Sequence, residues 1–119
     1  MKIAVAASPE VAIPTLEHLL ASEHELALII SRPDSQVGRG RELTPTAVSI
    51  WATAHGIELY RPKKAAYFDE RLKNFDLVIT IGYGLLLPEF LLNQPKHGFI
   101  NLHFSLLPKL RGAAPAQRA

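Results

Sequence analysis

The chain has no cysteine among its 119 residues. That absence excludes a disulfide scaffold, a thiolate nucleophile and a cysteine-ligated zinc site, and it is typical of a reducing compartment. Long apolar runs are lacking too, since none approaches the roughly 20 residues that a membrane-spanning helix needs. No charged leader or signal core precedes the first strand-like residues, Met1 to Val5. We therefore expect a cytoplasmic protein that makes no membrane contact.

The sequence also lacks a glycine-rich phosphate-binding turn. The first apolar run is followed by Ala7-Ser8-Pro9, which holds none of the glycines that a dinucleotide-binding turn requires. Gly38-Arg39-Gly40 lies well past the second apolar run, outside a strand-turn-helix context, and no loop ends in the Lys-Ser or Lys-Thr pair of a P-loop. The sequence thus argues against NAD, FAD and a P-loop nucleotide.

Size and charge set looser limits. With 48% apolar and 20% charged residues, the chain is typical of a globular protein with one core. Residues 1–60 carry four Lys/Arg against seven Asp/Glu, a net −3, whereas residues 61–119 carry nine against four, a net +5, which together give +2. The basic half could attract an anionic partner, but an imbalance of this size is also that of an ordinary solvated surface.

Apolar runs and helical spacings alternate along the chain. The runs predict strands at residues 3–7, 26–30, 57–60, 77–81 and 99–104. Between them, apolar spacings of three and four, prolines and capping residues predict helices that begin near residues 12, 44, 69 and 88. This alternation predicts an α/β fold with a doubly wound, Rossmann-like, mostly parallel sheet and helices on both faces. Ligands of such sheets bind at the carboxyl ends of the strands.

The first two predicted helices allow expectations for single residues. Thr44 is expected to cap the second helix, with Pro45 at its first position and Gly56 as its left-handed C-terminal cap. The buried stripes of the two helices are predicted to be Ala12, Ile13, Leu16, Leu19 and Leu20, and Ala47, Val48, Trp51 and Ala54.

Two connections that follow predicted strands stand out. The stretch from Arg32 to Thr44 is too long for a simple connection and holds Arg39 between two glycines. It is either a surface loop or an arm that reaches a phosphate backbone. Gly82-Tyr83-Gly84, after the fourth strand, is either a turn whose following leucines enter the core or a backbone that approaches a planar ligand.

The fifth predicted strand carries the most informative pattern. Alternation places Asn101, His103 and Ser105 on one face of a strand that we expect to be central and covered. Such a polar face must be hydrogen-bonded or line a cavity. An amide can donate to an oxyanion and an imidazole can carry a proton near neutral pH, two requirements of acyl or formyl transfer. The alternative is a structural pair bonded to nearby backbone. The other four histidines show no metal-ligand spacing, so no metal is expected.

Over nearly its whole length the chain resembles the 10-formyltetrahydrofolate-dependent formyltransferases. The stretch from Ile100 to Pro108, Ile-Asn-Leu-His-Phe-Ser-Leu-Leu-Pro, is similar to the signature of that family. The following Arg111-Gly112-Ala113-Ala114-Pro115 is similar to the branch that acts on tRNA, and the segments Arg32 to Arg41 and Tyr83 to Pro88 fit that branch as well. One departure is Ala7-Ser8-Pro9, where the family usually has Gly-Thr-Pro.

The resemblance implies transfer of a formyl group from 10-formyltetrahydrofolate to the α-amino group of methionyl-initiator tRNA, by a monomer and without a metal. As catalytic residues, Asn101 would stabilise the developing oxyanion and His103 would assist proton transfer from the attacking amine. Arg39 would contact the acceptor stem of the tRNA. The tetrahydrofolate would be bordered by Ser105, Leu106, Leu107 and Pro108.

The resemblance also implies that residues 1–119 are the N-terminal part of a catalytic domain. The family's third catalytic residue, an aspartate downstream of the histidine, and its C-terminal tRNA-binding barrel would then be absent, so we expect the 119 residues alone to have little or no activity. Two alternatives stay open. One is a folate-dependent formyltransferase that acts on a nucleotide-linked amino sugar or glycinamide ribotide, and the other is a non-catalytic α/β binding module.

Overall fold

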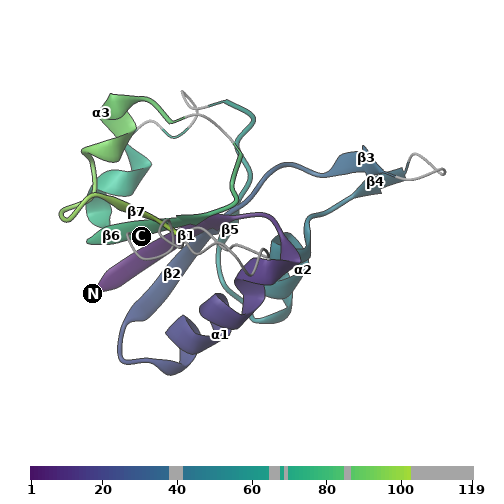
Figure 1. Ribbon diagram of the computed structural model, residues 1–119, viewed down its shortest axis with the longest axis horizontal. Helices are drawn as coiled ribbons and strands as arrows, with labels where there is room; N and C mark the ends of the chain where they lie inside the picture. Colours follow the sequence, from purple (N-terminus) through teal and green to yellow (C-terminus); the bar gives the residue numbers. More distant parts are fainter. Residues whose placement is uncertain (38–41, 65–67, 69, 85–86, 103–119) are drawn as a thin grey trace, which may run out of the picture.

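Five strands form one parallel sheet in the order β5-β2-β1-β6-β7 (Figure 1). The computed structural model describes residues 1–37, 42–64, 68, 70–84 and 87–102. The strands are β1 (Lys2–Ala7), β2 (Glu25–Ile30), β5 (Leu59–Tyr60), β6 (Leu77–Ile81) and β7 (Phe99–Leu102). All five predicted strands are therefore present. The third is shorter than predicted, and the end of the fifth prediction, residues 103 and 104, lies outside the described residues.

Helices cover both faces of this sheet, as Figure 1 shows. They are the 3-10 helices η1 (Glu10–Ala12) and η3 (Arg71–Asn74) and the α-helices α1 (Ile13–Ala21), α2 (Ala47–Ala54) and α3 (Glu89–Leu92). η1, α1 and α2 pack on one face, whereas η3 and α3 pack on the other. The predicted doubly wound α/β arrangement is confirmed. Within the described residues, no helix is long and apolar enough to cross a membrane.

The central strand β1 explains why the sheet needs two helical layers. Ile3, Val5 and Ala7 point toward α1 and α2, whereas Ala4 and Ala6 point toward η3 and α3, and all five are at most 2% exposed. A strand buried on both faces reads as a continuous apolar run, which is what the sequence offers at this position. The small alanines leave room for larger partners on the second face, including Phe68, Leu72 and Leu91.

The predicted helix stripes are correct in part. Ala12 and Leu16 of the first stripe and Val48 and Trp51 of the second are buried. The prediction that Leu20 is buried is wrong, because this side chain is 44% exposed in the last turn of α1. In α2 the stripe is rotated, so that Ser49 and Ala52 are buried and Ala54 is exposed.

The helix α2 begins two residues later than the sequence predicted. Its N-terminal cap is Thr46, whose hydroxyl accepts a hydrogen bond from the backbone N–H of Ser49 at 3.0 Å. Thr44 is the last residue of a strand instead, and its hydroxyl donates to the carbonyl of Glu42 at 3.2 Å. The sequence offers two threonines that could cap the helix, and the proline after Thr44 wrongly favoured that one. The left-handed cap at Gly56, with φ of 69°, is confirmed.

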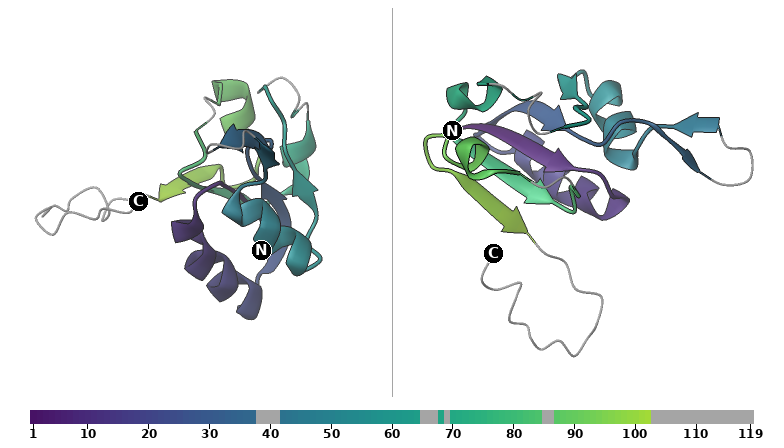
Figure 2. Two further views of the ribbon diagram at one scale, coloured as in Figure 1. Left: turned by 90° about the vertical axis from the view of Figure 1, so that its right-hand side faces the viewer. Right: turned by 90° about the horizontal axis from the view of Figure 1, so that it is seen from above.

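The long connection after β2 is a two-stranded antiparallel ribbon, where the sequence predicted a loop. β3 (Ser35–Val37) pairs with β4 (Glu42–Thr44), and the ribbon projects away from the body of the molecule (Figures 1 and 2). All three residues of β4 are exposed, including Leu43 at 68%. Because the described side chains of the ribbon are exposed, its sequence lacks the apolar alternation on which strand prediction depends.

Strand β7 is an edge of the sheet in the part of the chain that the structure describes, although the sequence predicted a central, covered strand. It pairs only with β6 there, from Val78 with Phe99 to Ile81 with Leu102. Ile100 and Asn101 are exposed in consequence. An apolar run shows that a strand packs on something, and says nothing of how many neighbours flank it.

Candidate functional site

The sheet has its topological switch point between β1 and β6. The chain passes from β1 to β2 and β5 on one side, then crosses back over β1 to β6 and β7 on the other. The connections that leave the carboxyl ends of β1 and β6 therefore diverge and open a crevice between them, where doubly wound sheets bind ligands. Ser8 and Pro9 follow β1 at this point, and Gly82 follows β6.

A hollow of about 500 Å³ lies at this crevice, and we call it the switch-point hollow. Its size is that of a small-molecule site. It extends from the ends of β1 and β6 to the base of the β3–β4 ribbon. Its lining residues are Ser8, Pro9, Glu10, Arg32, Pro33, Ser35, Thr44, Pro45, Thr46, Ala47 and Gly82.

One buried hydroxyl fixes three walls of the switch-point hollow. Ser31, fully buried directly after β2, donates to the carbonyl of Ala7 at the end of β1 at 2.6 Å. The same oxygen lies 2.6 Å from the hydroxyl of Thr46, the cap of α2, and 3.4 Å from that of Ser8. A buried hydroxyl is favourable only when it is bonded, and this one is bonded on several sides. Ser31 thereby holds together the segments that follow β1, follow β2 and precede α2.

Arg32 spans the switch point. It follows β2, yet its side chain reaches the connection after β6, where its Cδ and Nη1 come within 3.6 Å of the position that a Cβ on Gly84 would take. Because β1 separates β2 from β6, the side chain passes over the end of β1. Gly84 has φ of 94° and Gly82 has φ of 57°, a conformation that favours glycine, and a Cβ on Gly82 would lie 3.0 Å from the ring of Pro9. The glycines thus let this connection lie close to its neighbours.

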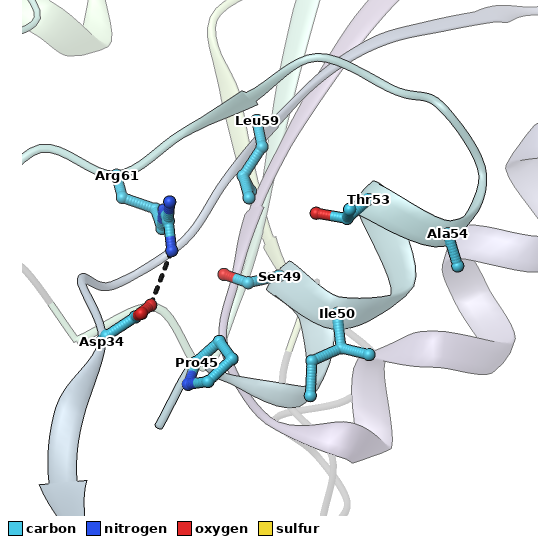
Figure 3. Close-up of a pocket in the computed structure, with 8 residues that line it drawn as sticks. All are labelled: Asp34, Pro45, Ser49, Ile50, Thr53, Ala54, Leu59 and Arg61. Atoms are coloured by element: carbon cyan, nitrogen blue, oxygen red, sulfur yellow. Dashed lines mark hydrogen bonds and ion pairs between the residues drawn. The ribbon is translucent and has the colours of Figure 1, made fainter. Parts of the chain in front are cut away.

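A second hollow, of about 410 Å³, lies between α2 and the end of β5 (Figure 3). At its mouth Arg61 and Asp34 face one another, and the guanidinium Nη1 lies 2.6 Å from the carboxylate Oδ1. The remaining walls combine the hydroxyls of Ser49 and Thr53 with apolar side chains. Since its two charged groups bind each other, the hollow offers no uncompensated charge to a ligand.

Tyr83 lies between the two glycines after β6 and is only 4% exposed. Its ring packs in the core on the η3–α3 side of the sheet, which favours the structural alternative for Gly82-Tyr83-Gly84. Leu87 packs against the same core, while Leu85 and Leu86 lie outside the described residues. Burial raises the pKa of Tyr83 to about 12, and its hydroxyl has no hydrogen-bond partner within the described residues. The tyrosine is therefore neutral at physiological pH.

Asn101 is the one predicted site residue that falls within the described residues. It lies near the carboxyl end of β7, in register with Thr80 of β6, and its Oδ1 accepts a hydrogen bond from the Thr80 hydroxyl at 2.9 Å. Both side chains project from the η3–α3 face of the sheet, because Val78 and Phe99, two residues earlier on each strand, pack in that core. The other end of the amide, Nδ2, is a hydrogen-bond donor.

The other predicted site residues lie outside the described residues. They are the tRNA-contacting Arg39, the catalytic His103 and the folate-bordering Ser105, Leu106, Leu107 and Pro108. Arg39 belongs to the segment that joins β3 to β4, and His103 follows β7 directly. Among the described residues, no group of three or more His, Asp or Glu side chains is arranged to hold a metal ion.

Sequence reasoning missed Ser31, Thr46 and the reach of Arg32. The first two carried a usable signal, because a small polar residue directly after a buried strand, or before a helix, needs a partner for its hydroxyl. For Arg32 no local signal exists, since its path over β1 depends on the order of the strands in the sheet. Strand order is a long-range property that residue patterns do not encode.

Comparison with known proteins assigns the chain to a family. The sequence profile of a family described as Formyl transferase matches residues 1–119. The chain is 46% identical over 124 residues to a methionyl-tRNA formyltransferase of Salinispora tropica, 46% over 123 residues to one of Thermobifida fusca and 47% over 124 residues to one of Streptomyces coelicolor. Each alignment covers 100% of this chain and 40% of the relative, so the chain spans about two fifths of their length. The chain belongs to the formyl transferase family.

Proposed function

We propose that this chain forms the N-terminal part of a catalytic domain that transfers a formyl group from 10-formyltetrahydrofolate to the α-amino group of methionyl-initiator tRNA. The observation that carries the proposal is the position of Asn101. It lies at the carboxyl end of a parallel strand next to the switch-point strand β6, with its oxygen bonded to Thr80. Doubly wound proteins carry out their chemistry at the carboxyl ends of their strands.

The chemistry requires a donor for an oxyanion and an acceptor for a proton. 10-Formyltetrahydrofolate supplies the formyl group, with Ser105 to Pro108 as its border. The Nδ2 of Asn101 donates a hydrogen bond to the formyl oxygen as negative charge develops there. The α-amine attacks the formyl carbon, and His103, two residues further on, takes the proton that this amine must lose to form a stable amide. The bond from the formyl carbon to N10 of the folate then breaks, and N10 takes up a proton from His103 or from water as tetrahydrofolate leaves. No step requires a metal.

The β3–β4 ribbon supports a macromolecular acceptor. It projects from the sheet beside the switch-point hollow, and residues 38–41, which hold Arg39 and Arg41, connect its two strands. An arginine between two glycines, with a second arginine beside it, suits contact with a phosphate backbone. Arg39 contacts the acceptor stem in this proposal.

The test uses a hybrid in which this chain replaces the matched region of the Thermobifida fusca relative. Transfer of labelled formyl groups from 10-formyltetrahydrofolate to methionyl-initiator tRNA is measured for the hybrid and for the 119 residues alone. The hybrid should form formyl-methionyl-tRNA, and the chain alone should form little or none. A folded hybrid without transfer, or a chain alone as active as the hybrid, would contradict the proposal.

Variants of the hybrid assign the roles. Asn101→Ala should lower kcat by about 10²- to 10³-fold, the loss typical of one oxyanion donor. Ile100→Ala, on the opposite face of β7, is the matched control and should stay within a few-fold of the parent. Arg39→Ala should raise the KM for tRNA. If Arg39→Ala has no effect on KM while transfer to a small amine substrate persists, the acceptor is a small molecule.

A further inference from the structure

Arg32 is a cation of the switch-point hollow that has no ion-pair partner in the described part of the chain. Of the described residues that line the hollow, Arg32 and Glu10 are the charged ones. Arg32 is exposed and forms no ion pair within the described residues, because Asp34 is held by Arg61 at 2.6 Å and Glu10 is not within bonding distance. An arginine fork presents five N–H donors in a plane, and it binds planar or tetrahedral oxyanions through two of them at once.

We propose that Arg32 binds a backbone phosphate of the single-stranded 3′ end of the acceptor tRNA. The inference rests on the proposed function and adds a residue to it. It assigns to Arg32 the part of the tRNA that lies between the ribbon and the reacting amine.

The shape of the hollow supports a strand of nucleic acid as its occupant. One end of the hollow is formed by Ser35 and Thr44 at the base of the ribbon, and the other by Ser8 and Gly82 at the carboxyl ends of β1 and β6. A single-stranded nucleic acid that leaves the acceptor stem at the ribbon and ends at the carboxyl ends of the β-strands passes through the switch-point hollow on this path. The hydroxyl of the exposed Ser35 supplies a further donor along this path.

The spacing of the strands agrees with this path. β2, which Arg32 follows, and β7, which carries Asn101, are three strand spacings apart, or about 14 Å. In aminoacyl-tRNA the α-amine is separated from the 5′ phosphate of the terminal nucleotide by eight bonds, a reach of about 10 Å when extended. The Arg32 side chain extends toward β6 and shortens the remaining gap. An amine at Asn101 therefore brings a terminal phosphate within reach of the guanidinium.

A carboxylate of the folate is the competing anion, and the arrangement of the sheet disfavours it. The segment proposed to border the folate, Ser105 to Pro108, follows β7. Arg32 instead follows β2, on the far side of the switch point, beside the ribbon. Its neighbours belong to the tRNA path, so the folate should not depend on it.

The experiment measures equilibrium binding of initiator tRNA to the hybrid between 50 and 200 mM salt, settings chosen because phosphate contacts are strongly salt-dependent in about this range. Arg32→Ala should weaken binding about tenfold at 0.1 M salt and lower the slope of log affinity against log salt by about 1. Arg32→Lys should retain the slope and lose part of the affinity. Lys63→Ala, an exposed cation after β5 outside the hollow, is the matched control and should change neither.

Truncated tRNA locates the contact. With an initiator tRNA that lacks its single-stranded 3′ nucleotides, Arg32→Ala should have no effect, while the affinity for 10-formyltetrahydrofolate should be unchanged throughout. An equal loss on intact and truncated tRNA, an unchanged salt slope, or a loss confined to the folate would each overturn the assignment. These outcomes are separate from the proposed function, which fails only if the folded parent hybrid transfers no formyl group.

Discussion

The hydroxyl of Thr80 donates to Oδ1 of Asn101 at 2.9 Å, across the adjacent strands β6 and β7. This bond engages the oxygen end of the amide. In the proposed mechanism, an amide rotated by half a turn would present that oxygen to the developing negative charge, which would repel it. Thr80 is, in that mechanism, a positioning residue for Asn101.

Replacement of Thr80 tests that role. In the hybrid, Thr80→Val keeps the shape of the side chain but removes the hydroxyl, so kcat should fall about tenfold, because the donor is no longer held in place, with KM for both substrates nearly unchanged. Thr80→Ser should restore kcat. Steady-state kinetics with each substrate varied in turn gives both parameters. Equal activity of the Val and Ser variants would show that Asn101 is oriented by other means.

The cap of α2 can be assigned by comparing two threonines. Thr46→Ala removes the acceptor for the Ser49 N–H and a partner of Ser31, and should lower the free energy of unfolding of the chain by about 1–2 kcal/mol. Thr44→Ala, at the position that the sequence favoured, should cost less than about 0.5 kcal/mol because its hydroxyl bonds only within the exposed ribbon. Urea unfolding measures both. The reverse order would place the cap at Thr44.

The buried hydroxyl of Tyr83 is a cost to the fold. Tyr83→Phe removes a polar group that has no partner in the described residues and should raise the free energy of unfolding by about 1 kcal/mol at pH 7. A loss of stability instead would mean that the hydroxyl is bonded.

The same variant should change the alkaline limb of the stability profile. The pKa of Tyr83 is raised to about 12 by burial, whereas an unfolded tyrosine titrates near 10. The unfolded state therefore loses the proton first, and stability falls as the pH rises from about 10 to 12. That fall should be shallower in Tyr83→Phe, as unfolding measured across this range would reveal.

Asp76 should contribute to the loss of stability at acidic pH. The backbone N–H of Lys2 bonds to its carboxylate at 2.7 Å and holds the pKa of Asp76 below its usual value, with Lys96 and the N-terminal ammonium adding to the effect. A lowered pKa stabilises the fold above the unfolded value of about 4, and this contribution is lost as the pH falls through the folded value. Asp76→Asn keeps an acceptor for Lys2 but does not titrate. Its stability should therefore decline less between pH 5 and the acid transition, which urea unfolding at stepped pH can establish.

The sheet and its layers could be predicted because they rest on local patterns. Leu77 to Ile81 form an apolar run that only a covered strand explains, and Gly56 is a helix end that few other residues tolerate. The ribbon could not be predicted, because Leu43 and its neighbours bury nothing and so leave no pattern. At the site, the residue type and spacing singled out Asn101, but its anchor Thr80 is known only from the register of β6 with β7. Long-range pairing likewise decides that Arg32 reaches Gly84.

The β3–β4 ribbon has a consequence for how such a protein can change. Its two strands pair with each other and lie apart from the two cores, so the folded state sets few conditions on its length or composition. Insertions, deletions and charge changes there should leave the melting temperature nearly constant. Under the proposed function, the ribbon recognises the partner and the sheet carries the chemistry. Substitutions in the ribbon could then change recognition of the partner without disturbing the sheet.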